Sequence, residues 1–211
     1  MLHIGGVDMK KLFACLLCFL TCLTFSGCSL LFHYQYDAVD NFYFGYSEIL
    51  KEAFVASYHW DETDAAKNIV IPEKYNGVKV TALGGYTGRG APCDFCVLPP
   101  KSYEDSFGVN QWAVSGMYEH IESVDTIYLN FDLHISKNIE QIKAHALDLF
   151  YEGTYFDGKT YHTKVIVVML FRVTCDEDNK TFYAEEGKLY YRKNNELVSD
   201  ILYFDHEFKK E

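Results

Sequence analysis

Residues 69–84 are Ile69-Val70-Ile71-Pro72-Glu73-Lys74-Tyr75-Asn76-Gly77-Val78-Lys79-Val80-Thr81-Ala82-Leu83-Gly84, and their pattern decides the predicted fold. The run Ile69–Ile71 is typical of a short strand, which Pro72 ends because proline has no N–H to donate to a sheet. After a turn, a second apolar cluster occupies Val80–Leu83. A strand, a turn and a second apolar ridge form one coil of a solenoid, whose apolar side is buried when coils stack.

A degenerate repeat of this pattern is predicted further along the chain. Apolar residues recur at the first, fourth and sixth places of Cys93–Pro99 and of Val124–Leu129, so we align these two stretches. Ile69–Pro72 matches the end of the same pattern. The apolar residues of Ile139–Leu147 supply a second ridge after the third unit. The sequence therefore predicts a β-rich, short and degenerate solenoid.

The remaining pattern is mostly that of strands and turns. Phe42, Phe44 and Tyr46 alternate with other residues, and Val165–Val173 is an apolar run that predicts a buried strand. The stretch Tyr155–Tyr161 predicts a hairpin, because its central Asp-Gly suits a tight primed turn. Helical periodicity is confined to two stretches, Ser47–Phe54 and Ile139–Phe150.

The C-terminal end predicts a cap on the stack. Lys188–Arg192 and Leu197–Tyr203 flank the polar stretch Lys193–Glu196, which is typical of a β-hairpin. We expect Leu189 to lie on the inward face and to pack on the strand of Val165–Val173. A final unit of this kind covers the apolar face that a stack of coils otherwise exposes.

The N-terminus predicts an export signal that is removed. Met9-Lys10-Lys11 is a positive start, and the apolar run Leu12–Leu23 is about a dozen residues, short of the ~20 that span a membrane. Thr24-Phe25-Ser26-Gly27-Cys28 resembles the lipobox of bacterial lipoproteins, with Phe25 where leucine is usual. The resemblance implies a signal peptide over residues 1–27 and a lipid, such as palmitate, on Cys28. An ordinary secretory signal, an uncleaved anchor and a start at Met9 remain alternatives.

The net charge of the mature chain limits the kinds of partner that it can bind. The chain has a formal net charge of −11 at pH 7, and loss of residues 1–27 makes it one unit more negative. Such a domain repels phosphate backbones, so we expect no nucleic-acid partner, and lipid must hold it to the membrane. We expect a short membrane-proximal tether over residues 28–36 and a single leucine-rich-repeat-like domain over residues 37–211, because no flexible linker divides the chain.

The cysteines allow several interpretations. Of seven cysteines, three leave with the signal and Cys28 is lipidated, so Cys93, Cys96 and Cys175 remain. The C-x-x-C spacing of Cys93 and Cys96 is compatible with buried core thiols, an exported disulfide or half a zinc site. The repeat alignment favours core thiols, because both cysteines take the places of Val124 and Ile127.

Three stretches resemble BspA-like leucine-rich repeat proteins. Ile69–Gly84 is similar to the family's opening unit, Ile139–Leu147 to its apolar ridge, and Val173–Tyr190 to its terminal unit. Two stretches depart from the family pattern: Gly85–Gly90 replaces a ridge, and Asn130–His134 lacks the Ile-Pro pair. The resemblance implies a surface-exposed binding or adhesion module without catalytic residues.

No arrangement of residues predicts a reaction, so we expect no enzyme, cofactor or metal. Asp176–Asn179 lacks the alternating ligands and central glycine of a calcium loop, and Gly84–Gly90 lacks the Lys-Ser/Thr of a phosphate loop. No zinc motif pairs the histidines of the mature chain: His33, His59, His120, His134, His145, His162 and His206. The prediction is a lipid-anchored, extracytoplasmic protein of the cell envelope that binds a protein or glycan. A small-ligand-binding lipoprotein is the alternative.

Overall fold

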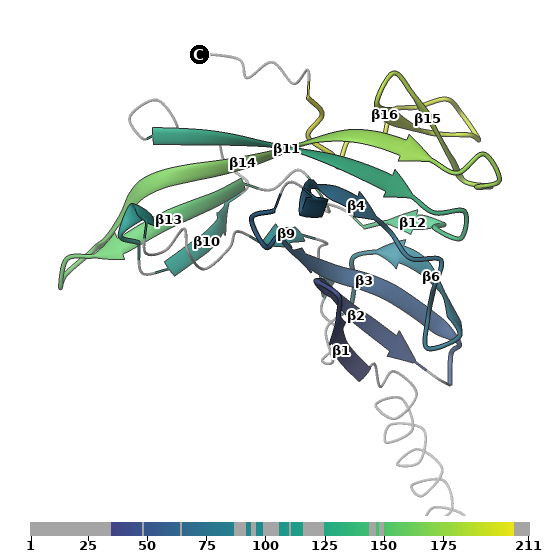
Figure 1. The fold of residues 1–211 in the computed structure, drawn as a ribbon, viewed down its shortest axis with the longest axis horizontal. Helices are drawn as coiled ribbons and strands as arrows, with labels where there is room; N and C mark the ends of the chain where they lie inside the picture. Colours follow the sequence, from purple (N-terminus) through teal and green to yellow (C-terminus); the bar gives the residue numbers. More distant parts are fainter. Residues whose placement is uncertain are drawn as a thin grey trace, which may run out of the picture.

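The computed structural model describes residues 35–47, 49–63, 65–86, 92–93, 96–98, 106–109, 111–115, 125–143, 147 and 150–204. These residues form strands for the most part, with a short 3-10 helix, η1 (Ala65–Lys67). The prediction of a β-rich fold is confirmed. Figure 1 shows the strands in two curled sheets that face each other, with a small hairpin above the upper sheet.

The N-terminal sheet begins as a meander. β1 (Gln35–Val39), β2 (Phe42–Ser47) and β3 (Glu52–His59) pair antiparallel in chain order. β3 then pairs in parallel with β6 (Val78–Leu83), and β6 pairs in parallel with β12 (Gln141–Ile142). The remaining members are β5 (Lys74–Tyr75), which pairs with β6, and β9 (Cys96–Leu98), which pairs with β3.

The second sheet has the order β10-β13-β14-β11-β4. Its bounds are β4 (Asn68–Val70), β10 (Gln111–Ser115), β11 (Asp125–Ile135), β13 (Phe150–Phe156) and β14 (Tyr161–Cys175). β14, β11 and β4 run parallel to one another, whereas β13 pairs antiparallel with β14 and β10. Two short hairpins complete the fold: β7 (Gly85–Tyr86) with β8 (Pro92–Cys93), and β15 (Phe182–Glu185) with β16 (Lys188–Tyr191).

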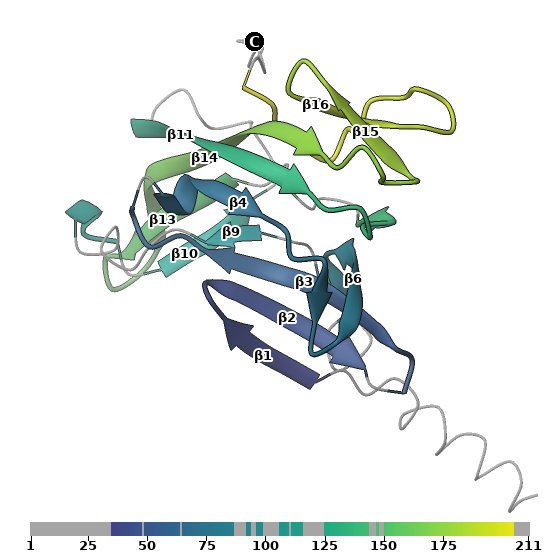
Figure 2. The same cartoon turned by 45° about the vertical axis from the view of Figure 1, so that its right-hand side comes forward.

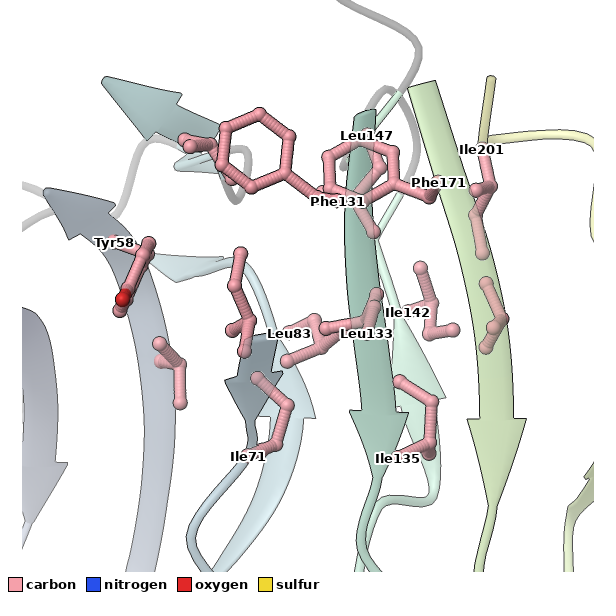
Figure 3. Packing of buried hydrophobic residues seen from close by; sticks show 14 of the residues in the cluster. Tyr58, Ile71, Leu83, Phe131, Leu133, Ile135, Ile142, Leu147, Phe171 and Ile201 are labelled. Carbon is pink, nitrogen blue, oxygen red and sulfur yellow. The ribbon is translucent and has the colours of Figure 1, made fainter. Parts of the chain in front are cut away.

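The two sheets share a buried core. Its cluster includes Phe44, Val55 and Leu83 from the first sheet and Leu133 and Phe171 from the second. Figure 3 shows side chains of β11 pointing into the space between the two sheets, where Leu133 lies near Leu83 and Ile142. Because each sheet buries one face against the other, the described strands form one packed body.

Aromatic rings connect the two halves of this core. Phe131 of β11 meets the Trp60 ring edge to face, with centroids 5.6 Å apart, and lies 5.9 Å from Phe171 of β14. Phe131 and Phe171 face each other in the parallel register. Trp60 directly follows β3, so these contacts join the end of one sheet to the centre of the other.

The predicted strands are present, but the predicted repeat alignment is wrong. β9 pairs with β3 in the first sheet, whereas Ile127–Leu129 pairs with β14 in the second. The register instead places Ile69 beside Leu133, and Leu133 beside Val173. Apolar residues at the first, fourth and sixth places occur in many strands, so that pattern alone did not identify the register of an 11-residue strand.

Neither predicted helix is present in the residues of these two stretches that the structure describes. Ser47–Phe54 contains the end of β2, a turn and the start of β3, and Lys51 has a φ of 55°, which a helix does not accept. In the stretch 139–150, the backbone N–H groups of Glu140 and Lys143 donate to carbonyls of β6. Pairing with a neighbouring strand therefore outweighs the local periodicity.

The predicted C-terminal hairpin is present only in part, because β16 pairs along its length with β15 and makes a single bridge to the stretch after the polar turn. Leu189 is fully buried, and β16 forms a bridge from Tyr190 to Leu197 across the predicted polar turn. The cap contacts β14, because the Val173 N–H donates to the Gly187 carbonyl at 2.8 Å. The return stretch after Leu197 is not a regular strand: Ile201 forms a bridge with Leu147, outside the named strands.

Candidate functional site

The predicted lipidation site, Cys28, lies outside the described residues, as do the predicted signal peptide and most of the predicted tether. The backbones of Cys93 and Cys96 lie in β8 and β9, but their side chains are outside the described part, so the core-thiol interpretation stays a prediction. Within the described ranges, no helix has the length and apolar character needed to cross a membrane.

Cys175 is a half-buried free thiol. Its Sγ donates to the Phe182 carbonyl at 3.7 Å, and burial raises the pKa of the Cys175 thiol to about 11. The thiol therefore stays protonated at neutral pH and is a poor nucleophile.

Two histidines lie beside carboxylates on the surface. His134 contacts the Thr174 hydroxyl through Nδ1 at 2.9 Å and Asp176 through Nε2 at 3.1 Å. Asp176 also accepts from the Lys137 N–H at 2.8 Å. These contacts join β11 to β14, and they join the turn after β11 to the turn after β14. Across the described ranges, no three His, Cys, Asp or Glu side chains are grouped to hold a metal ion.

A buried asparagine, Asn179, holds the loop after β14 in place. The Asn179 side-chain amide donates to the carbonyls of Ser136 and Ile139, at 2.9 and 3.0 Å. Its side-chain oxygen accepts from the N–H groups of Thr181 and Phe182, each at 2.8 Å. Asn179 therefore joins the turn after β11 to the turn after β14 and has a structural role.

The most exposed cluster of aromatic side chains among the described residues lies on the β13–β14 hairpin. We call its outer part, residues 154–163, the aromatic arm. Tyr161, Phe156 and Tyr155 are 59%, 49% and 38% exposed. Figures 1 and 2 show this hairpin at one end of the molecule, on the side away from β15 and β16.

The register of the hairpin pairs the rings across the two strands. Phe156 faces Tyr161 with ring centroids 4.9 Å apart, and Tyr155 faces His162 at 5.3 Å with an interplanar angle of 26°. Because side chains alternate along a strand, the two pairs lie on opposite faces of the ribbon. Each face of the arm thus carries one pair of rings.

Asp157 holds the turn at the tip of the arm. Its Oδ1 accepts from the N–H groups of Lys159 and Thr160, each at 2.8 Å, and its Oδ2 lies 2.9 Å from His162 Nε2. Gly158 adopts a φ of 98°, which a residue with a side chain rarely accepts. The predicted hairpin is therefore confirmed, but its turn is shifted by one residue from the predicted Asp-Gly pair: the Asp157 N–H donates to the Thr160 carbonyl at 3.2 Å, so Gly158 and Lys159 are the central residues.

These hydrogen bonds make the turn sensitive to acid. The Thr160 N–H, the His162 ring and the Lys159 N–H lower the pKa of Asp157 to about 2, from a usual value near 3.8. Because the folded pKa is depressed, the stabilisation is complete above about pH 4 and is lost as the pH falls towards 2. We expect an NMR titration of the Asp157 carboxyl to have a midpoint near pH 2.

A matched variant separates the causes of this shift. In His162→Gln the two backbone donors remain, so the Asp157 midpoint should rise but stay below that of a free aspartate. A wild-type midpoint near pH 4 would contradict the described turn.

The sequence indicated the hairpin but not the exposure of its rings. The part of β13 and β14 away from the turn is buried, and its cross-strand pair Tyr151 and Val167 belongs to the core. The available signal was the symmetry of Tyr155-Phe156 and Tyr161-His162 about Gly158-Lys159, which places aromatic residues opposite each other.

Comparison with known proteins adds no relative: no family model matches the chain, and neither a curated protein nor a solved structure matches it.

Proposed function

We propose that this chain is a membrane-anchored surface lipoprotein that acts as a protein- or glycan-binding module. The observation that carries the binding role is the aromatic arm, whose three exposed rings lie on a hairpin at one end of the molecule. Exposed aromatic side chains offer contact area at a low cost in conformational entropy. The lipobox-like stretch Thr24–Cys28 supports the anchor.

We also propose that the packed body is a short, degenerate leucine-rich-repeat solenoid. Parallel pairing of β4, β11 and β14 supports this, as does the parallel pairing of β6 with β12. In this arrangement two stretches take equivalent places in the repeat: Ile69-Val70-Ile71-Pro72 and Leu133-His134-Ile135-Ser136. The β15–β16 hairpin is the C-terminal cap.

The proposed location of the protein is the extracytoplasmic side of the cell envelope. The stretch from Cys28 to Gln35, where β1 begins, spans at most about 25 Å when fully extended. The domain is thus held close to its membrane by lipid. Its negative net charge disfavours contact with anionic headgroups, so the anchor is the lipid alone.

Replacing Cys28 by alanine tests the anchor. We expect Cys28→Ala to abolish metabolic labelling with palmitate and to release the protein from the membrane fraction, because only a thiol accepts the diacylglyceryl group. Cys175→Ala is the matched control and should keep both. Labelling that persists in Cys28→Ala would overturn the anchor.

Binding is tested with the full-length chain purified in a mild detergent. A panel of immobilised extracellular-matrix proteins and neutral oligosaccharides is probed, and the proposed function expects saturable binding to at least one member. If the folded protein binds nothing in either half of the panel, the proposed binding role fails.

A further inference from the structure

The size of the aromatic arm limits what it binds. Aromatic side chains bury about 150–250 Å² each when fully covered, so the half-exposed pair Phe156 and Tyr161 offers roughly 200 Å². A standard protein partner covers about 800 Å² on each side. The second ring pair cannot extend this area, because Tyr155 and His162 lie on the other face.

Polar groups border each pair of rings. On one face, the Tyr155–His162 pair adjoins Asp157, whose Oδ2 contacts His162 Nε2 at 2.9 Å. On the other face, the Phe156–Tyr161 pair adjoins Thr163, whose Oγ1 donates to the Glu152 carboxylate at 3.2 Å; the cross-strand partner Thr154 is buried. Each face therefore carries two neighbouring rings, inclined to each other by 26° for Tyr155–His162 and 39° for Phe156–Tyr161, with polar groups beside them.

This arrangement matches the chemistry of a sugar ring. One face of a pyranose presents C–H groups made electron-poor by the attached oxygens, and the negative face of an aromatic ring attracts them. The hydroxyls around the sugar then reach the polar groups beside the rings. Lys159 and Lys164 balance Asp157 and Glu152 near the arm, and the chain as a whole is acidic, so the favoured ligand is uncharged.

We propose that the aromatic arm is a carbohydrate-binding surface for neutral saccharides, which stack on Tyr155–His162 or on Phe156–Tyr161. This inference rests on the proposed binding function and names the ligand class of the same surface. A ribbon with one ring pair on each face contacts sugar units on either side of the hairpin.

The test uses the purified full-length chain and immobilised hexasaccharides of glucose, mannose or N-acetylglucosamine, with heparin as an anionic control. We expect saturable binding to at least one neutral hexasaccharide and none to heparin. Tyr161→Ala and Tyr155→Ala remove rings from opposite faces of the arm, and at least one of them should weaken that binding tenfold or more. Tyr161→Phe keeps the ring and should stay within about threefold of wild type.

Tyr128→Ala is the matched control, since Tyr128 is an exposed tyrosine on β11, outside the arm. It should leave saccharide binding unchanged. A folded wild type that binds no neutral hexasaccharide overturns the inference, and so does binding that both arm variants retain. If matrix proteins bind instead and the arm variants lose that binding, the arm is a protein-docking surface. The saccharide inference then fails while the proposed function stands.

Discussion

Replacing Asn179 by alanine is expected to lower the free energy of unfolding by at least about 3 kcal/mol. The Asn179 side chain is buried and makes four hydrogen bonds to backbone groups of two turns. Alanine leaves two carbonyls and two N–H groups without these partners, and each unsatisfied buried group costs about 1–3 kcal/mol. Local relaxation and water recover part of that sum. Urea denaturation followed by circular dichroism measures the loss.

Two further variants make this prediction specific. Asn179→Asp keeps the acceptor for Thr181 and Phe182 but places a carboxylate against the carbonyls of Ser136 and Ile139, so it should also destabilise strongly. Asn194→Ala, in the exposed turn after β16, is the matched control and should change stability by less than about 0.5 kcal/mol. Equal stability of Asn179→Ala and Asn194→Ala would contradict the role of Asn179 in joining the turns.

Phe131→Ala is expected to cost about 3–5 kcal/mol, the usual cost of removing a fully buried phenylalanine. The Phe131 ring contacts Trp60 after β3 and Phe171 of β14, so the cavity opens where the two sheets meet. Figure 3 shows Phe131 and Phe171 beside Leu147 and Ile201 in this region. Both sheets should lose stability together, in one cooperative transition.

Tyr128→Ala is the control for this variant, because Tyr128 lies on the same strand but is exposed. Its effect should be well below that of Phe131→Ala. Hydrogen exchange then reports on each sheet separately. Unchanged protection of β2 and β3 in Phe131→Ala would contradict a core shared by the two sheets.

The strands that were predictable from sequence are those whose burial is continuous or alternating. Val165–Val173 is almost wholly buried in β14, and the alternation of Phe42, Phe44 and Tyr46 coincides with β2. A turn near Asp157-Gly158 was predictable because Gly158 supplies the positive φ that the turn requires. In each case the local sequence carries the whole physical reason for the structure.

The register between distant strands was not predictable in this way. Leu133, rather than Ile127, faces Ile69, because β11 is long and carries apolar residues at several positions that fit the same template. The helical periodicity of Ile139–Phe150 was overridden by hydrogen bonds to β6, 60 residues earlier in the chain. Contacts of that kind depend on packing, which a single sequence does not express.

The features of the candidate site were likewise predictable only where they depend on local residues. The hairpin of the aromatic arm follows from local residues, whereas the exposure of Tyr161 depends on where the sheet ends. Asn179 gave no signal in the sequence beyond its place in an acidic turn, since its partners Ser136 and Ile139 come from a distant segment. The lipidation of Cys28 is predicted from the lipobox-like stretch alone.

Mass spectrometry of the N-terminal peptide of the protein recovered from membranes tests the central claim most directly. We predict a peptide that begins at Cys28, lacks residues 1–27 and carries a diacylglyceryl group on the cysteine sulfur. An unmodified Cys28, or a chain that still begins at Met1 or Met9, would contradict a lipid-anchored surface protein.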